Sequence, residues 1–146
     1  MKTITSSLMD KLPLAMAAAA GALLMSAGLA MGAGIEIELS GAEEVPAVTS
    51  TATGKAAITV AADKSVSGTV TTKGIAGIAA HIHAGPKGKN GPPVIPLEKT
   101  SQDTWSVPAG SKLSDEQYAS YKAGELYVNV HSAEHKGGEI RAQLKP

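Results

Sequence analysis

The sequence predicts an all-β domain, an antiparallel Greek-key-like sandwich or barrel with one short connecting helix. Short runs of alternating apolar and polar residues recur along the chain, separated by Gly, Pro, Asn and Asp. This is the pattern of half-buried strands joined by turns. The 146 residues also include no Phe and one Trp, so the core must use Val, Ile, Leu and Ala, which favours thin β layers over a large helical core.

Six alternating runs follow one another, and each places its apolar residues on one face of a strand. The apolar positions are Ile35, Ile37 and Leu39; Ala56, Ile58 and Val60; Val66 and Val70; Ile78, Ala80 and Ile82; Leu126, Val128 and Val130; and Ile140, Ala142 and Leu144. Turn-forming residues at 41–46, 62–64 and 74–77 separate the earlier runs. Residues 85–93 are rich in Gly and Pro and predict a long, turn-rich loop.

Residues 114–124 predict the connecting helix. Ser114 and Gln117 have the spacing of a capping box, in which each side chain accepts a hydrogen bond from a backbone N–H of the other residue. Gly124 is a natural helix stop. We therefore expect one short helix over residues 115–123, connecting two strands.

The N-terminus predicts a cleavable signal peptide over residues 1–33. A basic start precedes an uncharged, Ala- and Leu-rich run, and small residues place the cleavage site near residues 30–33. A retained membrane anchor is the alternative, because the run approaches the roughly 20 residues that a spanning helix needs. Its Ala and Gly content makes the run weakly hydrophobic and favours cleavage. We expect an exported protein, periplasmic or secreted, whose mature domain is residues 34–146 and does not span the membrane.

The charge balance and the lack of Cys limit the chemistry. The chain has 13 Lys and Arg against 13 Asp and Glu, and Lys2, Lys11 and Asp10 precede residue 34, so residues 34–146 carry a net charge of −1 with His neutral. Nothing in this balance indicates a nucleic-acid or membrane-surface partner. Without Cys there is no disulfide and no thiolate ligand, so a metal site would use His, carboxylate, Met or backbone oxygen.

Three of the four His residues are candidate metal ligands. Residues two apart on a strand share a face, so His81 and His83 both point away from the apolar face of their strand. The same parity places Tyr127, Asn129 and His131 on the non-core face of a later strand. If the two strands approach each other, three imidazoles suit copper, with zinc as the alternative. The other interpretation is a set of exposed polar residues on a solvated sheet face.

His135 and Arg141 are further candidates for this site. His135 lies in a Glu-His-Lys-Gly-Gly turn and is either a fourth ligand or, as we prefer, a turn residue. Arg141 lies on the polar side of the last strand and is either a surface residue in a weak ion pair or a guide for a small anion beside a metal. Trp105 is expected to be a partly buried packing residue.

Three separated motifs resemble the CHRD domain, a family named for its occurrence in chordin. They are Leu39-Ser40-Gly41-Ala42-Glu43-Glu44-Val45-Pro46; His81-Ile82-His83-Ala84-Gly85 with Gly88 and Asn90-Gly91-Pro92; and a C-terminal motif from Gly124 to His131 and from Gly138 to Leu144. The resemblance covers about residues 35–145 and is to bacterial-type, single-domain exported members. It implies an extracellular or periplasmic β-sandwich module, and in chordin such modules belong to a protein that binds growth factors.

The His pattern is also similar to the copper site of copper–zinc superoxide dismutases. That resemblance implies that His81, His83 and His131 hold copper and that Arg141 guides superoxide. The chain departs from those enzymes because it has no His between His83 and His131 and no disulfide. Three functions stay open: a module that binds a transition metal, a copper-dependent superoxide dismutase-like enzyme, and a non-catalytic structural or adhesive extracellular module.

Overall fold

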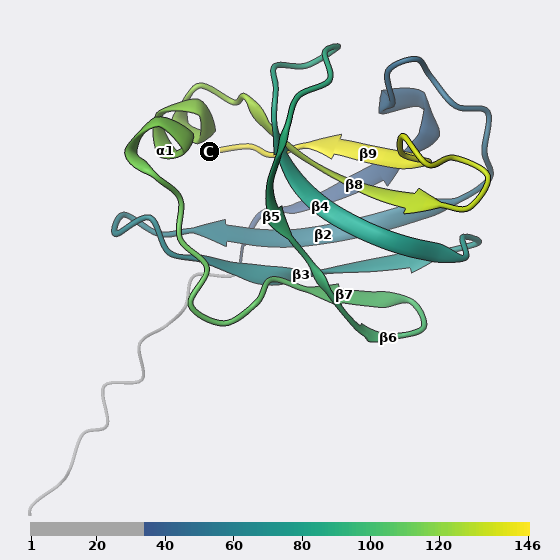
Figure 1. Cartoon of the computed structure of the whole chain (residues 1–146), viewed down its shortest axis with the longest axis horizontal. Helices are drawn as coiled ribbons and strands as arrows, with labels where there is room; N and C mark the ends of the chain where they lie inside the picture. Colours follow the sequence, from purple (N-terminus) through teal and green to yellow (C-terminus); the bar gives the residue numbers. More distant parts are fainter. Residues whose placement is uncertain (1–33) are drawn as a thin grey trace, which may run out of the picture. The chain divides into compact units, whose positions relative to one another are not determined.

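The computed structural model describes residues 34–146, and the expected signal peptide lies outside this range. The described part of the chain forms nine β-strands, one α-helix and a short 3-10 helix, η1 (Figure 1). The elements are β1 (Glu36–Ser40), η1 (Gly41–Glu43), β2 (Thr53–Val60), β3 (Val66–Lys73), β4 (Gly77–Ala84), β5 (Pro93–Pro96), β6 (Glu98–Ser101), β7 (Thr104–Ser106), α1 (Asp115–Lys122), β8 (Leu126–Ser132) and β9 (Ile140–Gln143). All the pairings between these strands are antiparallel, which confirms the predicted all-β class.

The strands form one sheet that curls into a nearly closed barrel. Its strand order is β5-β4-β8-β9-β1-β2-β3-β7-β6. The two edge strands, β5 and β6, follow each other in the chain with Leu97 between them, so one continuous segment runs from one edge of the sheet to the other (Figure 1). Leu97 is buried, and its amide donates a hydrogen bond to the carbonyl of Ala80 in β4 at 2.9 Å. The links from β3 to β4 and from β7 to β8 cross between the two halves of the sheet, as in Greek-key folds.

The interior of the barrel is built from the alternating apolar residues of the strands. Leu39, Val70, Ile82, Val128 and Ile140 are each at most 1% exposed. Burial of an aliphatic side chain of this size contributes about 1.5–3 kcal/mol, so these rows supply much of the folding free energy. Trp105 also lies in this core at 3% exposure, so it is buried more completely than the expected partly buried residue.

The predicted apolar face of β4 is wrong at its first position. Ile78 is 59% exposed, whereas Ala80 and Ile82 are buried. A β-bulge between Gly77 and Ala79 shifts the register of β4 against β8, so the alternation resets before Ala80. Ile35 is likewise 56% exposed, because it precedes the first residue of β1.

The one α-helix among residues 34–146 matches its sequence signals closely. Ser114 caps α1 through a capping box in which both the Ser114 and the Gln117 side chains accept backbone hydrogen bonds. The helix ends at Lys122, one residue before the predicted end, and Gly124 follows with a left-handed φ of +75°. Within residues 34–146, no helix has the length and apolar character needed to cross a bilayer.

The polar face of β8 and β9 is buried rather than solvated. Every residue of β8 is buried, including Tyr127 and Asn129, and Arg141 in β9 is only 1% exposed. The chain segments after β4 and between β8 and β9 cover this face, as their hydrogen bonds to these strands show. The barrel therefore has a second, polar buried layer outside its apolar core, and the candidate site lies in that layer.

Candidate metal centre

The structure brings His81, His83 and His131 together. His81 and His83 lie on β4, and His131 lies on the neighbouring strand β8, where it pairs with Ala79. Each ring offers one nitrogen, and the three nitrogens all lie within 4.8 Å of one another. The convergence that strand parity predicted for these three side chains is therefore present. A group of three imidazoles at this spacing could hold a metal ion.

The closest contact in the cluster joins the Nδ1 atom of His81 to the Nε2 atom of His131 at 3.0 Å. The ring centroids lie 4.9 Å apart for His81 and His131, 5.5 Å for His81 and His83, and 6.0 Å for His83 and His131. Imidazole nitrogens bind zinc at about 2.0–2.1 Å, so two ligands of one ion are at most about 4.2 Å apart. Small rotations of the rings would bring all three nitrogens within reach of a single ion.

Backbone carbonyls orient two of the three rings. His131 Nδ1 lies 2.9 Å from the carbonyl oxygen of Lys136, and His83 Nδ1 lies 2.9 Å from that of Gly91. A carbonyl oxygen only accepts hydrogen bonds, so Nδ1 carries the proton in both rings and Nε2 keeps its lone pair. The Nε2 atom of His83 is buried and makes no contact of hydrogen-bond geometry in the described part of the chain, although the Asn129 side chain lies close enough to act on the His83 pKa. In metal-binding His residues the ring nitrogen that does not bind the metal typically donates such a hydrogen bond, which fixes the orientation of the ring.

The surroundings favour neutral imidazoles. Burial lowers the pKa of His81 below its usual value of 6.5, and the nearby His131 and His83 lower it further. Burial also lowers the pKa of His83, and this outweighs the opposing hydrogen bond from its ring to Gly91. Neutral imidazole is the form that binds metal ions, so His81 and His83 are in the form that a metal ion could bind at neutral pH.

Arg141 lies beside this cluster but is enclosed. Its Nη1 atom donates to Oδ1 of Asn90 at 3.2 Å, and its Nη2 atom donates to the carbonyl of Lys89 at 2.8 Å. The guanidinium carbon lies 3.4 Å from the centre of the Tyr127 ring, a cation–π contact. The sequence placed Arg141 on the correct strand face, and its role as an anion guide stays a prediction.

His135 lies in the turn after β8 and is not part of the group of three. Its backbone N–H donates to the Ser132 hydroxyl at 3.1 Å, which is the turn geometry that the sequence favoured.

Glu139 lies close to His135, and the Ser50 hydroxyl donates a hydrogen bond to its carboxylate at 2.6 Å. Burial raises the pKa of Glu139, but hydrogen bonds from Ser132 and Ser50 and the proximity of His135 together lower it below 4.5. His135 therefore belongs to a separate polar cluster beside β8 and β9.

Sequence reasoning missed Glu44 and Asn129 as parts of the site. Glu44 is 6% exposed and Asn129 is 2% exposed, and one oxygen of each is buried with no hydrogen-bond partner among the described residues. Burial raises the pKa of Glu44 to about 7, against the lowering effects of Arg141 and of a hydrogen bond from Asn129. The strand parity of Asn129 was visible in the sequence, but no local pattern indicated that Glu44 folds over the same face.

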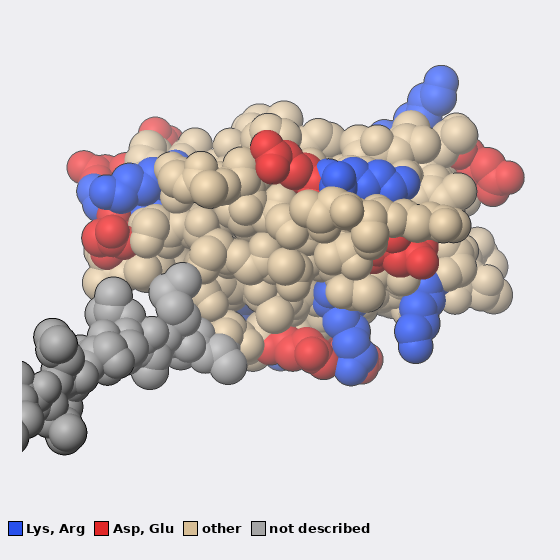
Figure 2. All heavy atoms as spheres, turned by 90° about the horizontal axis from the view of Figure 1, so that it is seen from below, with Lys and Arg blue, Asp and Glu red and all other residues tan. Residues whose placement is uncertain are grey.

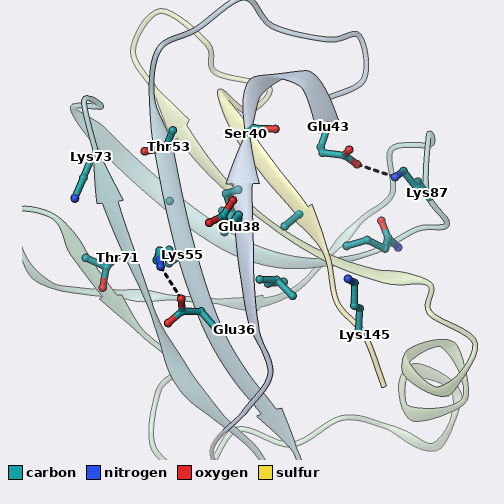
Figure 3. A pocket seen from close by; sticks show the side chains of 15 residues that line it. Glu36, Glu38, Ser40, Glu43, Thr53, Lys55, Thr71, Lys73, Lys87 and Lys145 are labelled. Atoms are coloured by element: carbon teal, nitrogen blue, oxygen red, sulfur yellow. Dashed lines mark hydrogen bonds and ion pairs between the residues drawn. The ribbon is translucent and has the colours of Figure 1, made fainter.

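A surface hollow lies on another part of the barrel. It has a volume of about 730 Å³ and is lined mainly by residues of β1, β2, β3 and β9, including three Glu and four Lys. Figure 3 shows two of the Glu–Lys pairs that neutralise one another, Glu36 with Lys55 at 2.7 Å and Glu43 with Lys87 at 3.3 Å. Figure 2 likewise shows acidic and basic side chains interspersed on the face it draws. These mixed charges do not select a ligand, so the His cluster is the stronger candidate.

The fold and this cluster define a small antiparallel β-barrel domain with three imidazoles gathered on its buried polar face. The model of the CHRD domain family matches residues 35–144, so the chain belongs to the CHRD domain family. No curated protein and no solved structure matched the chain. The family match covers nearly all of the described barrel and includes the three His residues.

Proposed function

We propose that this protein is an exported CHRD module that binds one transition-metal ion, copper in the first place, through His81, His83 and His131. The donor atoms are Nδ1 of His81 and Nε2 of both His83 and His131. Export is part of the proposal, and it agrees with the typical extracellular or exported location of CHRD domains. Export is also consistent with a metal site that uses no thiolate ligands, because exported proteins meet oxidising conditions and this chain has no Cys.

The observation that carries the proposal is the orientation of the two buried rings. The carbonyls of Gly91 and Lys136 hold the Nδ1 protons of His83 and His131 and leave both Nε2 lone pairs facing the cluster. In a purely structural cluster each Nε2 would be expected to take part in a hydrogen bond, as that of His131 does with His81, because an unpaired buried polar atom costs about 1–3 kcal/mol. The buried Nε2 of His83 has no such bond within residues 34–146.

The donor set supports copper over zinc as the first choice. Imidazole suits both metals, and for a given nitrogen site divalent copper binds more tightly than zinc. The three rings are neutral ligands and the cluster contains no carboxylate. A site without anionic ligands does not add the charge compensation that hard divalent cations prefer, and it excludes calcium and magnesium.

A copper titration with three proteins tests the proposal. The purified protein is titrated with copper, and separately with zinc, in competition with a chelator of known affinity, beside His83→Ala and His135→Ala. We expect one equivalent of copper to bind tightly to the unmodified protein and to His135→Ala, and at least 100-fold weaker binding to His83→Ala. Equal affinity of His83→Ala and the unmodified protein would overturn the proposal.

Superoxide dismutase-like activity is the second candidate function. Three protein ligands leave coordination positions free for a small anion, which is the arrangement of catalytic rather than structural metal sites. In this candidate, a copper ion held by the three His residues would supply the redox chemistry that converts two superoxide anions and two protons to dioxygen and hydrogen peroxide. The test compares copper-loaded protein with the same copper in chelating buffer. Equal rates would remove this candidate and leave copper binding intact.

A further inference from the structure

The loop at residues 85–91 lies directly over Arg141. Besides its bonds to Asn90 and Lys89, the Nη2 atom of Arg141 approaches the carbonyl of Pro86 at 3.5 Å, so the guanidinium holds three positions of the loop. A second anchor comes from the other side, where the Asn90 side chain donates to the carbonyl of Val45 at 2.7 Å. The loop is thus fixed to β9 and to the segment after η1.

Arg141 also forms one end of a stack that reaches the metal site. Its guanidinium lies on the Tyr127 ring, and the Tyr127 ring lies nearly parallel to the His83 ring, with centroids 4.9 Å apart and planes 11° apart. The Tyr127 hydroxyl accepts a hydrogen bond from the backbone N–H of Gly91 at 3.1 Å. The stack therefore limits the rotation of His83, and its middle member also touches the loop.

The loop and the stack meet at Gly91. The carbonyl of Gly91 accepts the Nδ1 proton of His83 at 2.9 Å. A Cβ atom at this position would overlap the carbonyl of Ala84, so only glycine lets the loop pass this close to β4. Arg141 thus acts on His83 along two routes, through Tyr127 and through the loop carbonyl that holds the ring proton.

We propose that Arg141 is a positioning residue of the His site, which holds residues 85–91 and Tyr127 so that His83 presents Nε2 to the metal. The role of the metal in this inference rests on the proposed function, whereas the contacts of Arg141 do not depend on it. An anion guide needs a guanidinium that an anion can reach. Arg141 is 1% exposed, and the donors described above point to loop oxygens.

The experiment reads the tautomer of His83 directly in the metal-free protein. Long-range proton–nitrogen NMR spectra of ¹⁵N-labelled protein report which ring nitrogen of each His carries the proton. The variants are Arg141→Lys, which keeps the charge but not the planar set of donors, and two milder changes, Asn90→Ala and Tyr127→Phe. Lys87→Ala is the matched control, because it alters the same loop but leaves the bonds of Arg141 in place.

We expect His83 of the unmodified protein and of Lys87→Ala to hold its proton on Nδ1. In Arg141→Lys, and to a lesser degree in Asn90→Ala and Tyr127→Phe, the His83 signals should move to a mixture of tautomers while His131 stays unchanged. Copper affinity should fall roughly 10- to 100-fold in Arg141→Lys, the usual effect of losing an outer-shell partner. Since Arg141 is buried and its replacement can unfold the domain, the two milder variants keep the test decisive.

Unchanged His83 signals in Asn90→Ala and Tyr127→Phe would overturn the inference. It would also be overturned if Arg141→Lys changed azide binding to the copper-loaded protein and left the His83 tautomer intact, since that is the behaviour of an anion guide. The two proposals fail in different ways. A protein that binds no copper contradicts the proposed function, while the NMR spectra of the metal-free protein still decide the role of Arg141.

Discussion

The Nδ1 atom of His81 lies 3.0 Å from the Nε2 atom of His131, although the two residues are 50 positions apart in the chain. The pairing of β4 with β8 creates this contact, and the ring planes meet at 72°. Because the proton of His131 is on Nδ1, where Lys136 accepts it, the contact is a hydrogen bond from His81 to a free lone pair. In our proposal a metal ion would take the place of that proton, and His81 would bind it through Nδ1 as the tautomer that carries its proton on Nε2.

Copper should therefore stabilise the folded protein. A ligand that binds only the folded state at 100 times its dissociation constant adds about 2.7 kcal/mol to the free energy of unfolding, which for a domain of this size raises Tm by roughly 10 °C. His131→Ala should abolish this increment, and His135→Ala should keep it. Differential scanning calorimetry with and without copper measures this increase in Tm for each protein. Comparing the increases removes the effect that each substitution has on the Tm of the metal-free protein. An equal increment in His131→Ala would contradict the proposed ligand set.

The folded protein should also bind copper at lower pH than His residues that are fully exposed to water. Protons compete with the metal for imidazole, and competition starts when the pH falls to the pKa of the ring. Since burial lowers the pKa of His81 and His83 below 6.5, the loss of affinity should begin below pH 6.5. The control is a peptide of residues 79–85, in which both rings are exposed to water. Copper affinity measured from pH 5 to 8 should fall at a lower pH in the protein, and coincident curves would contradict this prediction.

Gly138→Ala should destabilise the domain and disturb His131. Gly138 has a φ of +125°, and a Cβ there would lie 2.5 Å from Nδ2 of Asn129 and 2.5 Å from Oε1 of Glu44. We expect a loss of roughly 2 kcal/mol or more from the backbone conformation and the clash together. Copper affinity should fall as well, because the same turn supplies the Lys136 carbonyl to His131.

Gly137→Ala is the matched control for this change, since a Cβ at residue 137 meets no heavy atom within 4 Å. Urea unfolding of both variants gives the comparison. The control should remain within about 0.5 kcal/mol of the unmodified protein, as surface substitutions usually do. If both variants lose the same free energy of unfolding, the prediction is contradicted, and glycine is not required at residue 138 by the close packing against Asn129 and Glu44.

Strand periodicity predicted much of the barrel and the three His residues. Alternation is a local property with a period of two, so the shared face of His81 and His83 could be recognised without knowledge of the fold. The capping box of α1 is local in the same sense. The bulge at Ile78 was not predictable in this way, because it depends on how β4 fits against β8.

The burial of the polar face could not be predicted from periodicity. It depends on contacts between distant segments, such as Arg141 with Lys89, 52 positions apart, and Asn90 with Val45, 45 positions apart. No pattern within a strand indicates which loop will cover it. For the same reason Arg141 was expected near the surface or beside an anion, and its enclosed position emerged only when the loop was placed.

Glu44→Gln should change how stability depends on pH. Glu44 is buried, and its pKa rises from 4.5 to about 7 in the folded protein. Between these values the folded state keeps a proton that the unfolded chain has released, so the free energy of unfolding falls as pH rises through this window, by about 3 kcal/mol in total. The lowered pKa values of His81 and His83 act in the opposite direction, because the unfolded chain binds protons on these rings as pH falls through 6.5.

The difference between Glu44→Gln and the unmodified protein isolates the carboxyl, because both proteins keep the His residues. Gln cannot ionise, so the variant lacks the loss of stability between pH 4.5 and 7. Relative to the unmodified protein, Glu44→Gln should therefore gain about 3 kcal/mol between pH 4.5 and pH 8, whatever its stability at the acidic end. Urea unfolding at four or five pH values measures the two curves. If they run parallel, Glu44 is ionised in the folded protein well below pH 7, and Arg141 and Asn129 stabilise its charge more strongly than burial opposes it.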